Sequence, residues 1–367
     1  MTDISNPEQL RRQTLDLLRF PLAIVVMLIH IWPGPSSIDP QFCLLKLFCV
    51  TKSGFLSDQS VPIYFFIAGY VFFYNVDFNK ETYIKKLKNR TKTLLIPYII
   101  WNTIALVSLM LSQKLLHPTS FEPNISLRNI LDCYWNNRSS LFGDATPNAS
   151  SPIDPPLWFV RNLIIIVLFT PVLYNLIKHL KHYFIITLGL IWFLSNYIIG
   201  DTHFFAERLL SGIFFFSYGA YMSIHRRDML VEFGRYFKSS MIIYPSLCLL
   251  YIIASYTYPE TCSIIKGANI LVGLMFAYNF SSWLLRKGYC KVSPFLASSA
   301  FFIYVSHALI IGYIVAFQKY LINPNNEIRQ IIMYLLTSIM TAGILLGVFY
   351  LMRRYTPNLL KVIIGRK

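Results

Sequence analysis

The stretch FLASSAFFIYVSHALIIGYIVAFQ, residues 295–318, decides the class of fold. It contains no Asp, Glu, Lys or Arg, and it exceeds the roughly 20 residues that a helix needs to cross the hydrocarbon core of a bilayer. A lone strand would leave its backbone groups unpaired in lipid, so the stretch predicts a transmembrane helix.

Nine further apolar runs have the same character, and together they predict an all-α bundle of about ten transmembrane helices. The chain is 55% hydrophobic and only 14% charged, whereas soluble domains carry about a quarter charged residues. This composition excludes an ordinary soluble enzyme, and we expect one membrane domain over residues 1–367. The predicted spans lie near 15–32, 61–76, 94–112, 157–177, 183–200, 204–224, 240–257, 266–285, 295–318 and 330–352.

The net charge of +16 is explained by orientation in the membrane. With the N-terminus inside, most of the 33 lysines and arginines fall in the inner loops, for example in residues 80–92. Both termini are therefore predicted to be cytoplasmic, and no nucleic-acid partner is expected. The six cysteines lack the spacing of a zinc or haem site, so no metal is predicted; a disulfide between outer loops is left open.

The first span carries ionisable residues that are costly inside a membrane. At about 100° per residue, Asp16, Arg19, Ala23, Val26 and His30 share one stripe of a helix. Arg19 and His30 are eleven residues apart, or about 16 Å along the axis. One interpretation is a functional pair of sites at two depths; in the other, Arg19 reaches lipid headgroups and His30 marks the outer interface. Asp16 is expected to neutralise Arg19.

A basic segment precedes the third span. Arg90 and Lys92 lie at the depth where Arg19 leaves the membrane, and together they predict a cationic patch for a phosphate-rich ligand. The alternative is that these charges only fix the topology.

Further polar residues occur at the outer ends of spans and near the middle of the membrane. Trp158 fits an aromatic belt, and Arg161 lies one turn deeper in the same span. Tyr304 and His307 share a face of the span at 295–318, where a histidine held by one core hydrogen bond is the alternative to a functional one. Glu207 lies near the outer end of the span at 204–224.

Six segments spread over nearly the whole chain carry a family resemblance: LDLLRFPLAIVVMLIH (15–30), VPIYFFIAGY (61–70), KNRTKTLLIPYIIWN (88–102), PLWFVRNL (156–163), FFFSYGA (214–220) and SSAFFIYVSHALI (298–310). In this order they resemble the acyltransferase 3 family of ten-helix membrane acyltransferases, which modify bacterial surface glycans and related acceptors. The Arg–x10–His spacing and the basic start of the third span are the specific parts.

The resemblance implies that His30 is catalytic and that Arg19 is the matching first-span arginine. Of the family's Arg-x-x-Arg before the third span only Arg90 is present, with Lys92 two residues later. The family's Ser-Gly-Phe is replaced by residues 68–70, Ala-Gly-Tyr, so the serine hydroxyl is absent.

The resemblance also implies a reaction. Cytoplasmic acyl-CoA, expected to be acetyl-CoA, would be held by Arg19, Arg90 and Lys92, while His30 removes the proton of the acceptor hydroxyl or carries the acyl group. We expect an acceptor that is a surface glycan or lipid-linked sugar, in a bacterial inner membrane. The other expected roles are contact with the acceptor (Trp158, Arg161), stabilisation of the oxyanion (Tyr304 or His307) and orientation of His30 (Glu207).

Two rival functions remain open on the sequence. A transporter or flippase of a glycan, lipid or organic anion would also carry intramembrane His and Arg. The second rival is a family member that binds acyl-CoA but does not turn it over. Release of CoA from acyl-CoA separates the enzyme from both.

Overall fold

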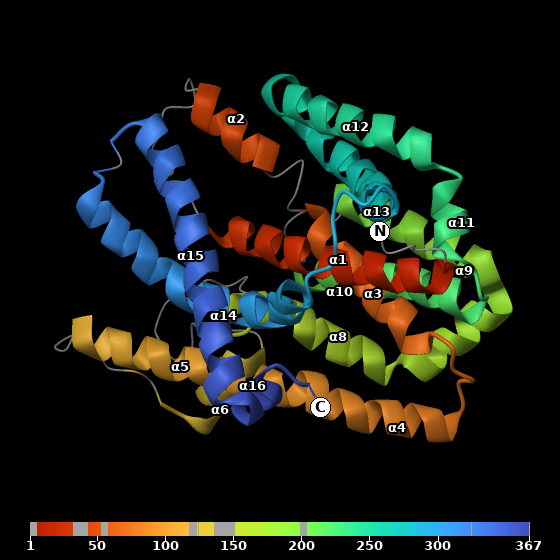
Figure 1. Cartoon of the computed structure of the whole chain (residues 1–367), viewed down its shortest axis with the longest axis horizontal. Helices are drawn as coiled ribbons and strands as arrows, with labels where there is room; N and C mark the ends of the chain where they lie inside the picture. Colours follow the sequence, from red (N-terminus) through yellow and green to blue (C-terminus); the bar gives the residue numbers. More distant parts are fainter. Residues whose placement is uncertain are drawn as a thin grey trace.

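The computed structural model describes residues 6–31, 43–52, 58–116, 123, 125–135, 151–198, 204–323 and 325–366, and every element in them is helical (Figure 1). The elements are α1 (Pro7–His30), α2 (Cys43–Lys52), α3 (Asp58–Phe73), α4 (Lys80–Arg90), the π-helical turn η2 (Thr91–Leu95), α5 (Ile96–Leu116), α6 (Leu127–Trp135), η3 (Pro155–Leu157), α8 (Trp158–Leu168), α9 (Thr170–Ile198), α10 (Phe204–Ile224), α11 (Met229–Gly234), α12 (Phe237–Thr257), η5 (Pro259–Thr261), α13 (Cys262–Arg286), α14 (Pro294–Leu321), α15 (Glu327–Tyr355) and α16 (Pro357–Ile363).

Each of the ten predicted spans overlaps at least one helix of the described residues. In the described part of the chain, six helical segments are long and apolar enough to cross a membrane, and the bent pair of α8 and α9 makes a seventh. The helices of this pair meet at 67°. The all-helical class is therefore confirmed, while the count of ten passes and the orientation stay predictions.

The backbone of α9 breaks at Lys181, where φ is 53° and ψ is −131°. The sequence predicts a short inner loop at this place, between the spans at 157–177 and 183–200. Because a positive φ is costly for a residue with a Cβ, the helix cannot continue through it. α8 with the first part of α9 thus corresponds to one predicted span, and the rest of α9 to the next.

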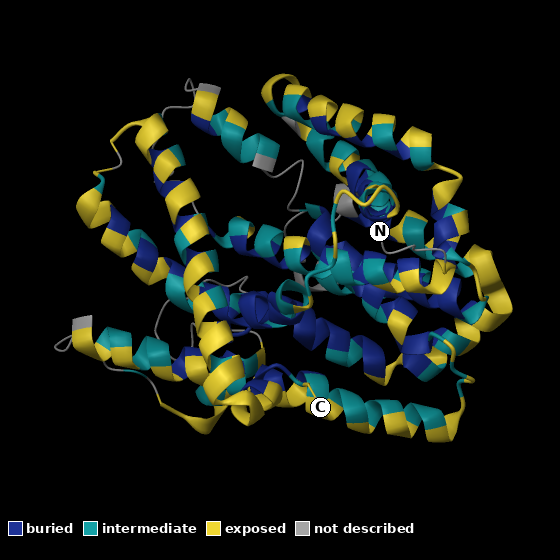
Figure 2. Ribbon diagram, viewed as in Figure 1, coloured by how far each residue is buried: buried dark blue, intermediate teal, exposed yellow. Residues whose placement is uncertain are grey.

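The core is built around the close contact of α3 with α10. A Cβ atom added to Gly69 would lie 2.0 Å from the carbonyl oxygen of Phe216, and one added to Gly219 would lie 2.0 Å from that of Phe66. The two glycines therefore let the backbones touch, as small residues do in membrane helices. The buried residues gather in these central helices and in α1, α8 and α14 (Figure 2).

Two short helices lie between the predicted spans. α2 lies between the predicted spans at 15–32 and 61–76, and its Phe48 contacts Tyr334 of α15 edge-on at 5.0 Å between ring centroids. α6 lies between the predicted spans at 94–112 and 157–177, and the amide of Ile153 donates to the Cys133 carbonyl at 2.7 Å. No disulfide joins any two of Cys49, Cys133, Cys248, Cys262 and Cys290.

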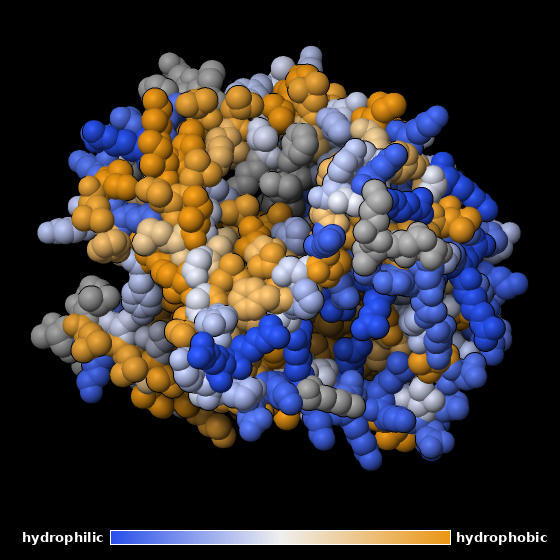
Figure 3. Space-filling model, in the orientation of Figure 1, coloured by the Kyte–Doolittle hydropathy of each residue, from blue (hydrophilic) through white to orange (hydrophobic). Residues whose placement is uncertain are grey.

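Polar and apolar surfaces separate along the bundle. In Figure 3 hydrophilic side chains gather on the right of the view, where Figure 1 places α11 and the start of α1, and the surface over α15 is largely apolar. This distribution places the charged segments at the end that the sequence predicts to be cytoplasmic.

Candidate functional site

Two helices bring three of the predicted site residues together. His30 is the last residue of α1, and His307 and Tyr304 lie one turn apart in α14. The rings of His30 and His307 are 5.1 Å apart between centroids, and those of His307 and Tyr304 are 6.4 Å apart. His30 is partly exposed, whereas His307 is fully buried. The three side chains therefore form one cluster, which we call the histidine cluster.

The hydrogen bonds of His307 define where its proton lies. Its Nδ1 is 3.0 Å from the carbonyl oxygen of Ile303, and a carbonyl can only accept, so Nδ1 donates. Nε2 of the neutral ring then carries a lone pair, and within the described residues it has no hydrogen-bond partner. His307 thus presents a buried acceptor beside His30.

Tyr304 connects the histidine cluster to the segment before α8. Its hydroxyl donates to the Pro156 carbonyl, and its ring contacts those of Tyr64 and Phe159 at 6.3 and 5.9 Å. The Tyr64 hydroxyl in turn donates to the Arg19 carbonyl at 2.6 Å. The sequence analysis selected neither Tyr64 nor Phe159, because aromatic residues at helical spacing are usual in any core.

Asp154 is the buried ionisable residue that the sequence analysis did not select. It is 1% exposed, and neither carboxyl oxygen has a partner among the described residues. Its backbone N–H donates to Oδ1 of Asn102 at 3.3 Å. Desolvation by burial raises the pKa of Asp154 well above its ordinary value, so the folded protein favours the neutral acid.

The predicted acceptor residues Trp158 and Arg161 lie in two separate cation–π contacts. The guanidinium of Arg208 lies 4.5 Å from the Trp158 ring centroid and donates to Ser151 at 3.1 Å. Arg161 is 1% exposed, lies 5.6 Å from the Trp135 ring centroid and donates to the Trp135 carbonyl. Arg161 therefore fastens α6 to α8.

The predicted cationic patch falls into separate groups. Arg19 pairs with Asp16 at 3.0 Å, which confirms the expected neutralisation. Arg366 lies near Arg19 and Arg353; burial lowers its pKa, and the two like charges lower it further. Arg353 and Arg366 were not predicted to join Arg19, because over 330 residues of sequence separate them from it.

Arg90 and Lys92 belong to the segment that packs beside this group, since a Cβ added to Gly365 would lie 2.4 Å from the carbonyl oxygen of Thr93. The Arg90 guanidinium lies 5.7 Å from the Phe72 ring centroid. Lys92 lines a cavity of about 490 Å³ with Lys85, Lys86 and Lys88. The predicted role of Arg90 and Lys92 in binding the donor stays a prediction. Glu207 lies in α10, but its side chain is outside the described residues, so its predicted role stays a prediction.

The family model that describes an acyltransferase domain, that of the acyltransferase 3 family, matches residues 12–353 of the 367-residue chain. The chain belongs to the acyltransferase 3 family. With its apolar helices, this membership makes it an integral membrane acyltransferase. Comparison with curated proteins and with solved structures gave no match. No three His, Cys, Asp or Glu side chains gather as a metal site in the portion that the structure describes.

Proposed function

We propose that this acyltransferase moves an acyl group, acetyl in the simplest case, from cytoplasmic acyl-CoA to a hydroxyl of a surface glycan or lipid-linked sugar. It would do so as a single domain of a bacterial inner membrane, with both termini cytoplasmic. The observation that carries the proposal is the pairing of His30 with His307 at the end of α1 opposite to the basic groups.

The donor is proposed to bind near Arg19. Arg19, Arg353 and Arg366 form a cluster of guanidinium groups in which Asp16 supplies a carboxylate. Guanidinium groups bind phosphate oxygens in pairs of parallel hydrogen bonds, which suits the pyrophosphate of CoA. Arg19 lies about 16 Å from His30 along α1, and the pantetheine arm would span this distance.

His30 is proposed as the general base. It takes the proton of the acceptor hydroxyl as the oxygen attacks the thioester carbon, and the carbon–sulfur bond breaks as the CoA thiolate leaves. The proton then passes from His30 to that thiolate. In the variant of this mechanism with a covalent intermediate, the imidazole first takes the acyl group and the hydroxyl attacks the acyl-imidazole.

His307 and Tyr304 receive roles that differ from those expected. The Tyr304 hydroxyl and the His307 Nδ1–H each donate to a backbone carbonyl, so neither is placed to donate to an oxyanion. We assign His307 to position His30 through its open Nε2, and Tyr304 to hold the segment before α8 against α14. Glu207 as the group that orients His30, and Trp158 and Arg161 as acceptor contacts, remain part of the proposal.

The experiment that tests the proposal follows free CoA thiol in purified protein supplied with acetyl-CoA and a hydroxyl acceptor. Thiol release above the rate without protein is expected. Arg19→Gln should raise the KM for acetyl-CoA about tenfold or more, because a charge-assisted contact is lost. Lys114→Gln, an exposed lysine near the end of α5, is the control. Acceptor movement across vesicles without any thiol release would instead establish the transporter.

A further inference from the structure

A cavity of about 480 Å³ lies apart from the histidine cluster, at the end of the bundle where α1 begins. Its walls come from α1, α9, the end of α3 and the turns that follow α3 and α10. A volume of this size falls within the range of about 300–1,000 Å³ that small-molecule pockets occupy. We call it the arginine cavity.

The lining of the arginine cavity is strongly positive. Arg11, Arg226 and Arg227 line it, against a single carboxylate, Asp77. The side chain of Arg226 is exposed and makes no hydrogen bond or ion pair with any described residue. Guanidinium groups converging on a concave surface favour phosphate ligands, which they bind through paired hydrogen bonds.

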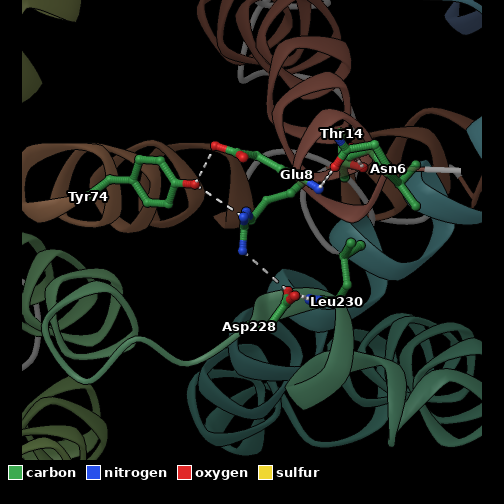
Figure 4. Close-up of polar contacts among 8 residues, drawn as sticks. Asn6, Glu8, Thr14, Tyr74, Asp228 and Leu230 are labelled. Atoms are coloured by element: carbon green, nitrogen blue, oxygen red, sulfur yellow. Dashed lines mark hydrogen bonds and ion pairs between the residues drawn. The ribbon is translucent and has the colours of Figure 1, made fainter. Parts of the chain in front are cut away.

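Arg11 and Arg227 are held in place by carboxylates beside the cavity. Arg11 lies 3.6 Å from Asp228, and Arg227 donates to Glu232 at 3.1 Å. Arg11 also donates to the Tyr74 hydroxyl at 3.1 Å; Figure 4 shows Tyr74 and Asp228 on the two sides of this network. These contacts fix the guanidinium groups before any ligand arrives, which reduces the entropy that binding costs.

The backbone around the arginine cavity is in an unusual conformation. Three described residues other than glycine have a positive φ, and two of them, Asn75 (50°) and Arg226 (51°), line this cavity. Both residues follow the end of a helix, α3 or α10, where a residue in the left-handed region commonly closes the helix. At the end of α10 the amide of Arg227 donates to the Met222 carbonyl at 2.8 Å, as in such a cap.

One wall of the arginine cavity is aromatic. The rings of Tyr70 and Tyr74 are 5.3 Å apart, and the Arg11 guanidinium lies 5.3 Å from the Tyr74 ring centroid. Tyr174 from α9 adds a third ring. Flat aromatic and guanidinium faces stack with nucleobases, so the ligand class indicated is a purine nucleotide with several phosphates and not a bare phosphate ion.

We propose that the arginine cavity binds the phosphorylated adenine-nucleotide end of the acyl-CoA donor, an inference that rests on the proposed function. Arg11 lies 19 residues before His30, or about 28 Å along α1. About twenty bonds separate the thioester sulfur of CoA from its adenine ring, which an extended chain covers in about 24 Å. The His30 and Arg11 side chains cover the rest, and Arg19 lies at the intermediate depth that the pyrophosphate would reach.

Arg226→Gln tests this assignment, because Arg226 has no partner whose loss would disturb the fold. Binding of adenosine 3′,5′-bisphosphate, measured by calorimetry without turnover, should weaken about tenfold. The ratio of kcat/KM for acetyl-CoA to that for acetyl-pantetheine, which lacks the nucleotide, should fall by a similar factor. Lys238→Gln, at an exposed position of α12 outside the cavity lining, is the control and should change neither quantity.

Arg226→Gly separates a folding effect from a binding effect. Glycine relieves the positive φ, so thermal stability should rise while bisphosphate binding still weakens. Unchanged bisphosphate binding in Arg226→Gln overturns the proposal. Weakened bisphosphate binding with an unchanged donor ratio also overturns it, because the cavity would then bind a different nucleotide. If Arg226→Gln weakened binding to bilayer discs containing phosphatidylglycerol but left bisphosphate binding unchanged, the cavity would be assigned to a lipid headgroup.

These outcomes are distinct from failure of the proposed function. If the wild-type protein released no thiol from either donor, the acyl-transfer proposal would fail, while the calorimetric comparison would still report on the arginine cavity.

Discussion

Asp154 shows how much a single buried group can affect this protein. Its carboxyl group is 1% exposed and has no hydrogen-bond partner among the residues described. A buried charge without a partner costs far more than a buried neutral acid, which is why burial raises the pKa of Asp154.

This raised pKa predicts a dependence of stability on pH. Since the pKa of Asp154 in the folded protein lies above its ordinary value of 3.8, the folded chain holds a proton that the unfolded chain releases. The free energy of unfolding should therefore fall as pH rises from about 4 through the folded-state pKa. Asp154→Asn removes this pH-dependent contribution to stability. The melting temperature of the variant should therefore increase relative to that of the wild type as the pH rises.

Thermal unfolding in detergent over pH 4–8 measures the effect. Asp132→Asn, a partly exposed aspartate of α6, is the matched control and should run parallel to the wild type. A constant offset between Asp154→Asn and the wild type at every pH would contradict the buried-acid account.

At the residue scale, the sequence could identify groups that are costly in a membrane but not their neighbours. His30, Tyr304 and His307 were predicted as site residues, and the structure brings them together. The burial of Asp154 could not be predicted, because nothing in a polar loop sequence indicates that distant helices bury one of its carboxylates.

At the scale of elements, the contact of α3 with α10 depends on two glycines. Gly69→Ala and Gly219→Ala each place a methyl group about where a backbone carbonyl now lies. The helices must separate, which should lower the free energy of unfolding by about 1–3 kcal/mol for each variant. The double variant should cost less than the sum, because both methyl groups force the same separation.

Gly312→Ala in α14 is the control for these variants. Nothing lies within 4 Å of a Cβ at this position, so alanine should be neutral or stabilising by up to about 1 kcal/mol. Melting temperatures in detergent decide the question. A Gly69→Ala protein as stable as Gly312→Ala would show that α3 and α10 do not meet through these glycines.

The positions of the helices could be predicted from the sequence, because an apolar run in a membrane satisfies its backbone hydrogen bonds by forming a helix. The run at 204–224 has the same bounds as α10. The bend between α8 and α9 was not predicted, although Pro171 lies just after it, because proline is common within membrane helices. The attachment of α6 through the bonds that Arg161 and Tyr98 donate to its carbonyls depends on long-range contacts that no local pattern reports.

At the scale of the whole molecule, the orientation is a prediction from the distribution of charge. Single cysteines introduced for Lys238 and Asn325 in a cysteine-free chain should react on opposite sides of the membrane, Lys238 with reagents in the cytoplasm. Both positions are exposed, so access should not limit labelling. Labelling of both from the same side would contradict the predicted topology.

His30 is proposed to perform acyl transfer, and an assay with labelled acetyl-CoA tests this role most directly. Purified His30→Ala protein and wild type are supplied with acetyl-CoA labelled in the acetyl group and with a hydroxyl acceptor, and thiol release and label on protein and acceptor are followed. His182→Ala, a histidine at the turn of α9, is the control. The account predicts a loss of at least 100-fold in rate for His30→Ala, with acetyl-CoA binding retained and the control unchanged. A folded His30→Ala protein that transfers acetyl at the rate of the wild type would contradict it.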